Sequence, residues 1–96
     1  MAPPDWTHNE LTVNGASLHY VRTGDGSKPP LVLVHGFSDD GLCWAQTARE
    51  LEDRYDIVMP DARGHGGSAR IQPGERVDMA ADLAGLIQAL ELRRPI

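Results

Sequence analysis

Residues 31–34 read Leu-Val-Leu-Val and are followed directly by His-Gly-Phe at residues 35–37, and this stretch decides the fold. An unbroken apolar run rich in β-branched residues is typical of a strand buried on both faces of a helix-covered parallel sheet. A second run of this kind, Tyr55–Met59, ends at Pro60. Between the two runs apolar residues recur every three positions, which predicts a helix with one face on the sheet. Strand, helix and strand in this order predict a βαβ unit.

Upstream of this unit, two short segments alternate between apolar and polar residues, Glu10–Val13 and Ser17–Val21. An Asn-Gly pair separates them, and it is a strong hairpin signal because both turn positions need a positive φ. We therefore predict a β-hairpin over residues 10–22. Residues 1–9, which contain a Pro-Pro pair, are predicted to form a flexible lead-in.

Downstream, residues 61–74 contain four glycines and a proline, which indicates a long loop. An apolar face predicts a helix over Val77–Leu92, and Pro95-Ile96 resemble the start of a further parallel strand. The predicted fold class is α/β, with a β-hairpin followed by a βαβα segment over residues 31–96. We expect a mostly parallel, incomplete sheet in one partial domain spanning residues 1–96.

Composition and charge exclude several classes of function. The chain carries 9 Lys and Arg against 14 Asp and Glu, a net charge of −5 with no basic stripe, so we expect no nucleic-acid partner. The longest uncharged apolar-rich stretch, residues 83–90, is far shorter than a membrane span. Residues 1–10 lack the pattern of a secretory signal. We therefore expect a cytoplasmic protein with no membrane partner.

Cysteine and histidine usage argues against a metal site. Cys43 is the one cysteine, which excludes an internal disulfide and a zinc cage. The four histidines lack the spacing of metal ligands, so no metal is expected. Cys43 lies near the start of a predicted helix, where a thiol can become reactive, but buried packing is the preferred interpretation. For Trp44 we likewise favour packing on the sheet over lining a pocket.

The tetrapeptide His35-Gly36-Phe37-Ser38 lies where the first buried strand ends. Ligands of open α/β sheets bind beyond the carboxyl ends of strands, so this is a favourable place for chemistry. A glycine after the strand lets the backbone turn sharply and leaves N–H groups pointing outward. Such donors can stabilise negative charge that develops on a substrate carbonyl oxygen. The alternative is a plain strand-to-helix turn.

A second glycine-rich motif follows the second buried strand, over residues 61–68. Gly64, Gly66 and Ala69 formally fit the dinucleotide-binding pattern G-x-G-x-x-A. We discount that pattern, because Pro73-Gly74 intervene before the next helix and the acidic residue at the right distance lies inside that helix. The structural interpretation is a turn braced by Asp61 and Arg63, against each other or against nearby backbone.

Together, residues 31–37, residues 55–68 and the helix sequence from residue 80 resemble the α/β-hydrolase superfamily. The resemblance covers residues 11–96 and is greatest for the esterase, haloperoxidase-like and C–C-bond hydrolase branch. It implies the N-terminal half of an α/β-hydrolase sheet, a small-molecule substrate and no cofactor. It also implies that the backbone N–H of Phe37 is an oxyanion-hole donor, supported by His35 and Gly36, with His35 orienting the turn rather than acting as a base. The loop near the site would contain Asp61, Arg63, Gly64, His65, Gly66 and Ser68.

The sequence departs from that family in lacking the nucleophile motif G-x-S-x-G. None of the serines at positions 17, 27, 38 and 68 is flanked by the two glycines, and no residue of the triad is identified. We therefore expect the N-terminal part of a serine hydrolase acting on an ester-like carbonyl. The triad would come from a second, complementary C-terminal hydrolase chain or from a missing C-terminal part. One alternative is a catalytically inactive, truncated module that associates with another chain or with itself. Another is a nucleotide-binding βαβ domain, which rests only on the discounted glycine pattern.

Overall fold

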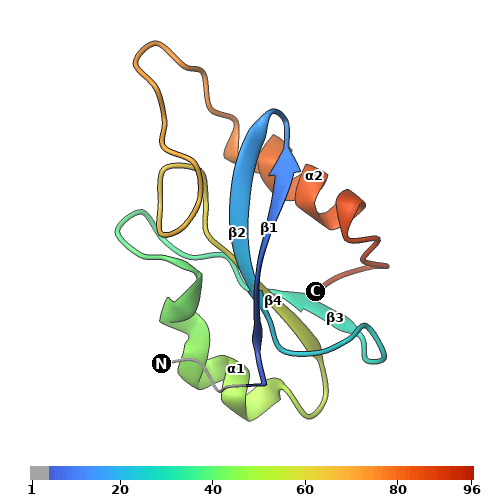
Figure 1. The fold of residues 1–96 in the computed structure, drawn as a ribbon. Coiled ribbons are helices and arrows are strands. Elements are labelled where there is room, and N and C mark those ends of the chain that lie inside the picture. The colour runs from blue at the N-terminus through green and yellow to red at the C-terminus, as the bar shows by residue number, and fades with distance from the viewer. Residues whose placement is uncertain (1–4) are drawn as a thin grey trace.

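The computed structural model describes residues 5–96, which form one four-stranded sheet with an α-helix packed on each face (Figure 1). Along the chain the elements are β1 (Thr7–Val13), β2 (Ala16–Arg22), β3 (Pro30–Val32), a 3-10 turn η1 (Gly41–Trp44), α1 (Ala45–Leu51), β4 (Asp56–Pro60) and α2 (Met79–Ala89). The predicted order of hairpin, strand, helix, strand and helix is confirmed.

The sheet has the order β1-β2-β4-β3 and is mixed. β1 with β2, and β2 with β4, pair antiparallel, whereas β3 and β4 pair parallel. From the sequence we expected a mostly parallel sheet. The described residues instead form a mixed sheet in which one of the three strand pairings is parallel. The physical reason is that a tight hairpin reverses the chain, and only the crossover through α1 returns a strand in the same direction.

The hairpin turn has the predicted conformation, with φ of 50° at Asn14 and 79° at Gly15. Its first strand begins at Thr7, so Thr7–Asn9 are strand rather than the predicted lead-in. Trp6 precedes this strand and is only 4% exposed, which explains why the chain is ordered here. Residues 1–4 of the predicted lead-in lie outside the described residues.

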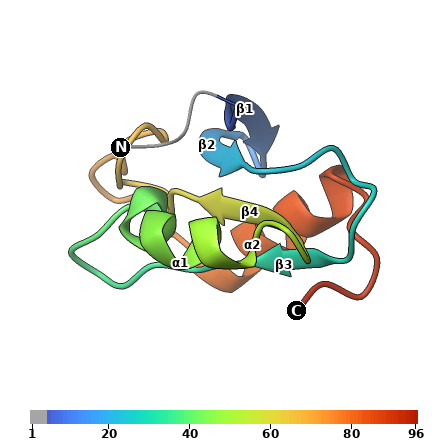
Figure 2. The same ribbon diagram turned by 90° about the horizontal axis from the view of Figure 1, so that it is seen from below.

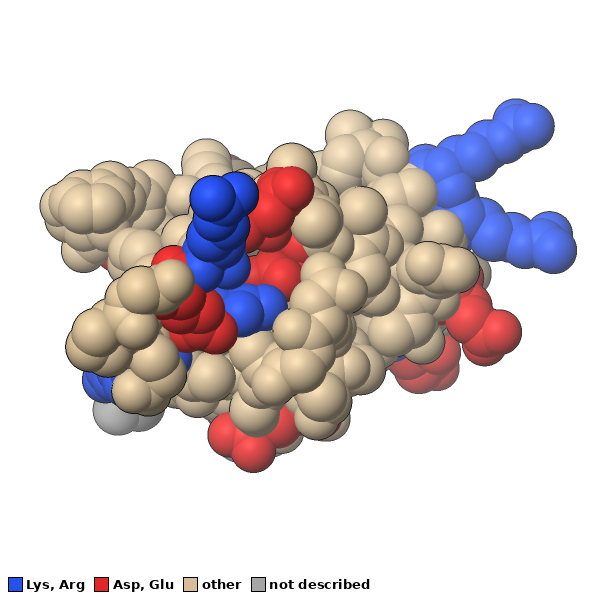
Figure 3. Space-filling model, turned by 90° about the horizontal axis from the view of Figure 1, so that it is seen from above, with Lys and Arg blue, Asp and Glu red and all other residues tan. Residues whose placement is uncertain are grey.

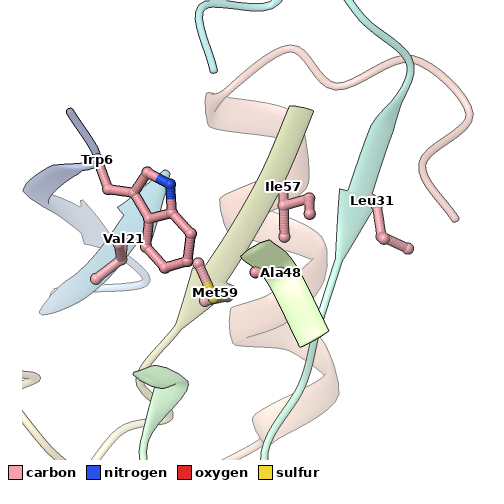
Figure 4. Close-up of a cluster of buried hydrophobic side chains, with 6 residues drawn as sticks. All are labelled: Trp6, Val21, Leu31, Ala48, Ile57 and Met59. Carbon is pink, nitrogen blue, oxygen red and sulfur yellow. The ribbon is translucent and has the colours of Figure 1, made fainter. Parts of the chain in front are cut away.

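Two hydrophobic cores lie on opposite faces of the sheet, and β4 contributes to both. All five residues of β4 are buried, as predicted for a strand covered on both faces. Ile57 and Met59 point toward α1, whereas Val58 between them points toward α2. The core beneath α1 contains Trp6, Val21, Leu31, Ala48, Ile57 and Met59 (Figure 4). The core beneath α2 contains Val13, Leu18, Tyr20, Val58 and Leu86.

The helix α2 begins two residues later than the sequence predicts. The side chain of Asp78 accepts a hydrogen bond of 3.0 Å from the Ala81 N–H, so Asp78 caps the helix. One turn further along, Gly85 lets α2 approach the hairpin closely. A Cβ atom at Gly85 would lie 2.5 Å from Cγ1 of Val13.

The chain ends beside β3, and the C-terminus lies next to this strand in two perpendicular views (Figures 1 and 2). The Val32 N–H donates to the Ile96 carbonyl at 2.8 Å, and the Ile96 N–H donates to the Pro30 carbonyl at 3.0 Å. In a parallel ladder, one residue bonds in this way to two residues of the neighbouring strand, those on either side of its partner. Ile96 thus pairs with the outer edge of β3, as expected for the start of a further parallel strand.

Acidic and basic side chains lie side by side in the left half of the face shown in Figure 3. Long basic side chains extend from the other end of that view without forming a stripe. Neither helix of residues 5–96 has the length and apolar character needed to cross a bilayer.

Candidate functional site

Two loops meet at the carboxyl ends of β3 and β4. Because the two strands are parallel, the segments that follow them, residues 33–40 and 61–74, begin at the same end of the sheet (Figure 1). This is the end at which open α/β sheets bind ligands. The predicted site residues of both motifs therefore lie close together.

His35 ties the first loop to the second. The Ala62 N–H donates to Nε2 of His35 at 3.0 Å, so this ring nitrogen must present its lone pair. The other nitrogen, Nδ1, lies 2.6 Å from the Gly36 carbonyl, which can only accept, so Nδ1 carries the proton. Both ring nitrogens are engaged by backbone groups. This is the arrangement that an orienting residue requires and that a general base does not have.

His65 completes the link from the other side. Its Nε2 lies 2.6 Å from the carbonyl oxygen of Phe37 and its Nδ1 lies 3.2 Å from the carbonyl oxygen of Arg63. The rings of His65 and His35 are 5.0 Å apart between centroids. The two histidines therefore hold the backbone on both sides of the Gly36–Phe37 peptide.

Phe37 presents its backbone N–H at the tip of this turn. Its side chain is 91% exposed, and among residues 5–96 no acceptor bonds its N–H. An open polar hollow of about 460 Å³ lies along the turn, between Phe37 and His65. A more enclosed apolar hollow of about 260 Å³ lies on the side of His35, lined among others by Val34, Met79 and Leu83. The residue with the unbonded N–H thus lines the polar hollow, and His35, two residues earlier, lines the apolar one.

Gly36 does not have the conformation expected for a sharp glycine turn. It is absent from the residues with positive φ, and a Cβ atom there would meet only the Asp39 carboxylate, at 3.5 Å. The turn closes instead through a hydrogen bond of 3.3 Å from the Asp39 N–H to the Gly36 carbonyl. The backbone and the space at Gly36 therefore do not require glycine.

Two glycines of the second loop do have a backbone conformation that disfavours side chains. Gly64 has φ of 85° and Gly66 has φ of 49°. A Cβ atom at Gly66 would overlap the Asp61 carboxylate, and one at Gly64 would lie 2.9 Å from Ile71. At Gly66 both the backbone conformation and the available space select glycine.

Asp61 is the centre of the second loop. Its Oδ1 accepts from the Gly41 N–H at 2.6 Å, and its Oδ2 accepts from the Gly67 N–H at 2.9 Å and from His19 Nδ1 at 2.7 Å. Burial alone raises the pKa of Asp61, but the hydrogen bonds from Gly67, Gly41 and His19 outweigh it and lower the pKa below its ordinary value. The carboxylate is only 5% exposed, and it joins β2, η1 and the loop.

Arg63 braces a different set of groups. Its guanidinium makes a bidentate pair with Asp82 of α2 at 2.9 and 3.0 Å, and a further bond to Glu75 at 3.0 Å. A longer contact of 3.4 Å reaches the Asn14 carbonyl in the hairpin turn. The partners of Asp61 and Arg63 are thus different groups, and the two do not brace each other. Asp61 binds backbone N–H groups, which was the alternative expectation, whereas Arg63 binds mainly the side chains of Asp82 and Glu75.

Ser68 has a structural position. Its Oγ accepts from the His19 N–H at 2.8 Å and donates to the Asp61 carbonyl at 2.6 Å. The first bond ties the loop to β2, the second bond closes the loop on its own first residue, and Ser68 is buried. Ser68 is therefore held by its neighbours rather than presented to a substrate.

Cys43 is exposed, which contradicts the buried packing that we expected. The short η1 turn points the side chain outward, while its neighbour Trp44 packs against the core beneath α1 as predicted. Partial desolvation, and then the negative charges of Asp39 and Asp40, raise the pKa of the Cys43 thiol. A raised pKa disfavours the nucleophilic thiolate.

The sequence did not indicate three residues that organise the site. His19, Asp82 and Glu75 bond Asp61 or Arg63 from positions 42, 19 and 12 residues away in the chain. No local pattern links such positions. In the part of the chain that the structure describes, no group of three or more His, Cys, Asp or Glu side chains is arranged to hold a metal ion.

Comparison with known proteins agrees with this geometry. The sequence profile of the family described as alpha/beta hydrolase fold matches residues 29–96. The soluble epoxide hydrolase of Corynebacterium sp. (strain C12) is 34% identical over 85 residues, which cover 88% of this chain and 29% of that protein. The non-heme chloroperoxidase of Burkholderia pyrrocinia is 32% identical over 87 residues, which cover 88% of this chain and 31% of that protein.

Among solved structures, a bacterial membrane phospholipase A superposes with a TM-score of 0.87 at 29% identity, covering 95% of this chain and 30% of that chain. The chain thus spans about a third or less of the length of the proteins it matches. These proteins carry three different activity names. The shared segment therefore supplies features common to the fold rather than those that select a substrate.

Proposed function

The chain belongs to the α/β-hydrolase fold family, and on that premise we propose that it supplies the oxyanion-stabilising turn of a hydrolase. The proposed substrate is a small molecule with an ester-like carbonyl group. The observation that carries the proposal is the Phe37 N–H, which has no acceptor among residues 5–96 and belongs to a residue that lines the open polar hollow.

The chemistry follows from where charge develops. When a nucleophile attacks a carbonyl carbon, the carbonyl oxygen becomes negative, and a fixed N–H donor stabilises it more than it stabilises the substrate. The bonds from His35 to Gly36 and from His65 to Phe37 hold the peptide before reaction, so little reorganisation is required. In this proposal the nucleophile is a serine on a G-x-S-x-G elbow outside residues 1–96, which forms an acyl-enzyme that water then hydrolyses. No cofactor takes part.

The test removes the N–H donor at position 37 and keeps a residue at that position of the turn. Phe37→Pro has no backbone N–H, whereas Phe37→Ala keeps it. Both are compared in an assembly of residues 1–96 with the polypeptide that carries the elbow, using an activated ester and a fluorophosphonate probe. Loss of one donor is expected to lower kcat about 100- to 1000-fold in Phe37→Pro and little in Phe37→Ala. Equal turnover of the two variants, with equal melting temperatures, would refute the assignment.

We also propose that the chain works with a complementary hydrolase chain, or by self-association, rather than as an isolated monomer. Val34, two residues after the end of β3, is 51% exposed, and Ile96, which bonds the outer edge of β3, is 67% exposed. Apolar strand edges of this kind recruit further strands. Light scattering on residues 1–96 is expected to give a self-associated species, with neither ester turnover nor probe labelling. A folded monomer would contradict this.

Epoxide hydrolysis is a second candidate, favoured by the similarity to the soluble epoxide hydrolase of Corynebacterium. The same assembly separates the two candidates when it is given an activated ester and an epoxide in parallel. The preferred substrate class is the one with the higher kcat/KM. A third outcome, no turnover of either, would favour the catalytically inactive module, since the chain itself has no G-x-S-x-G motif.

The location is likewise a proposal. One free, exposed cysteine and an acidic composition suit the reducing environment of the cytoplasm. Cell fractionation with an antibody against the chain tests this location, and recovery in an extracellular or membrane fraction would contradict it.

A further inference from the structure

Two histidines of the hairpin face each other, and one of them, His19, also bonds Asp61 of the loop after β4. Nδ1 of His8 in β1 lies 3.2 Å from Nε2 of His19 in β2, although the residues are 11 apart in the chain. The ring centroids are 5.4 Å apart and the ring planes are inclined by 30°, so the rings are stacked with one nitrogen of each in contact. Glu10 is paired directly with His19 in the register and therefore lies on the same side of the hairpin.

The other two histidines have no nitrogen available for a ligand. Both nitrogens of His35 are bonded to backbone groups, the Ala62 N–H and the Gly36 carbonyl. Both nitrogens of His65 face carbonyl oxygens, those of Phe37 and Arg63. Among the histidines of this chain, only His8 and His19 direct ring nitrogens at each other.

We propose that His8 and His19 together bind a divalent transition-metal ion such as Zn²⁺. Two imidazole nitrogens on one tetrahedral zinc ion lie about 3.3 Å apart, given Zn–N bonds of about 2.0–2.1 Å. The 3.2 Å separation of the two nitrogens therefore already matches that of two zinc ligands. On binding, the proton between the two nitrogens passes to water and Nε2 of His8 takes one up, so that His8 coordinates through Nδ1 as a neutral imidazole. The exposed His8 ring turns so that both lone pairs point at the ion.

The group that would orient His19 toward the ion is already in place. Nδ1 of His19 lies 2.7 Å from the Asp61 carboxylate, so Nδ1–H donates and Nε2 keeps its lone pair for the ion. Asp61 is itself fixed by the N–H groups of Gly41 and Gly67. A carboxylate that orients a metal-binding histidine is the usual outer partner of zinc sites. His19 is therefore held in one tautomer and one orientation before an ion arrives.

Water can supply the remaining ligands of the ion, and a nearby negative charge favours a cation. The side chain of His19 is 19% exposed and His8 is exposed, so water reaches the remaining coordination positions. The negative charge of Glu10, opposite His19, favours a cation at this place. With two protein ligands the site is an exchangeable surface site. It would tie β1 to β2 and, through Asp61, to the loop after β4.

Titration calorimetry with ZnCl₂ on the tag-free chain tests the proposal, in a Cys43→Ser background so that the exposed thiol does not compete. We expect saturable binding of one ion per chain, a raised melting temperature, and loss of both in His8→Ala. His65→Gln removes a histidine whose nitrogens are already occupied, and it is expected to keep both. Circular dichroism confirms that each variant is folded, and His8 is exposed, so its truncation leaves the core intact.

Two results would overturn the proposal. One is the absence of saturable binding in the folded background protein. The other is His8→Ala binding Zn²⁺ as tightly as the background, which would place the ion elsewhere. Nitrogen-resolved NMR of the histidine rings provides an independent readout: Zn²⁺ is expected to shift the signals of His8 and His19 and leave those of His35 unchanged. Shifts at His35 or His65 alone would equally refute the site.

Discussion

Nε2 of His65 lies 2.6 Å from the carbonyl oxygen of Phe37, which is 28 residues earlier in the chain. The loop after β4 thereby holds the turn after β3. An N–H donor is useful to catalysis only if its direction is fixed before the reaction, and the peptide that carries the Phe37 N–H is fixed from both sides by His35 and His65. The following predictions test this arrangement and the bracing around it.

Loss of the His65 donor should loosen the turn without unfolding the protein. In His65→Leu the Phe37 carbonyl loses its partner, and we expect the bonded Asp39 N–H to exchange faster. The increase should correspond to about 0.5–1.5 kcal/mol of lost protection, the contribution of one hydrogen bond. His65→Gln places an amide NH₂ near the position of Nε2 and should restore slow exchange. Exchange measured by NMR checks both variants, and equal rates in all three proteins would show that this bond does not hold the turn.

Gly66→Ala and Gly36→Ala should differ clearly in stability. Alanine at position 66 combines a strained positive φ with overlap of the Asp61 carboxylate, and should lower the free energy of unfolding by about 1–3 kcal/mol. Alanine at position 36 meets only ordinary contacts and should change it by less than about 0.5 kcal/mol. Urea unfolding measures both. A large loss of unfolding free energy in Gly36→Ala would show that the backbone at position 36 does require glycine.

Asp61 should make stability fall at acid pH. Its pKa is lower in the folded protein than its ordinary value of 3.8, so its stabilising contribution is present in full above that value. The contribution is lost as the pH falls through the lower folded-state pKa, because the unfolded chain takes up the proton first. Melting temperatures measured from neutral pH down to acid should show this fall in the wild type. Asp61→Asn should be less stable at neutral pH and show a shallower fall, and a parallel pH profile would contradict the assignment.

Arg63 and Asp82 should act as one unit. Removing either side chain leaves a buried partner uncompensated, so Arg63→Ala and Asp82→Ala should each destabilise the fold. The double variant should be less destabilised than the sum of the two single variants, because the second substitution removes a group that is already unpaired. Denaturant unfolding of all four proteins provides the cycle. Arg93→Ala is the matched control, and strict additivity would show that the pair is uncoupled.

Gly85→Ala should destabilise the protein although alanine favours helices. The gain in helix propensity is about 1 kcal/mol, whereas overpacking against Val13 costs about 1–3 kcal/mol. The reason is the 2.5 Å approach of a Cβ atom at this position to the Val13 side chain. In a Val13→Ala background the clash disappears, and the same substitution should become stabilising. Thermal melts of the four proteins test the change of sign.

The elements that could be predicted from the sequence are those with a local signature. The Asn14-Gly15 turn requires two positive φ values and has them, and the unbroken apolar run of β4 is buried on both faces. Such features depend on neighbours a few residues away. The start of β1 was missed because Thr7–Asn9 is polar and exposed, and the burial of Trp6 beside it depends on core residues far away in the chain.

The site could be predicted only in outline. Topology brings the ends of β3 and β4 together, which places His35 near residues 61–68 as expected. The bracing partners could not be predicted, since the pairing of Asp61 with His19 spans 42 residues and involves no repeated spacing. The roles of the glycines also differ from expectation. The strained conformation falls on Gly64 and Gly66 rather than Gly36, because the Gly36 turn closes with an ordinary backbone bond.

The position of β4 between β2 and β3 has a consequence for synthesis of the chain. β4 is made after both of its neighbours, and until residues 56–60 leave the ribosome the hairpin and β3 share no hydrogen-bonded partner. At about 5–20 residues per second this interval lasts on the order of seconds. During it the apolar segment around Leu31 is exposed to the cytosol, and this is the period in which a chaperone would be needed most.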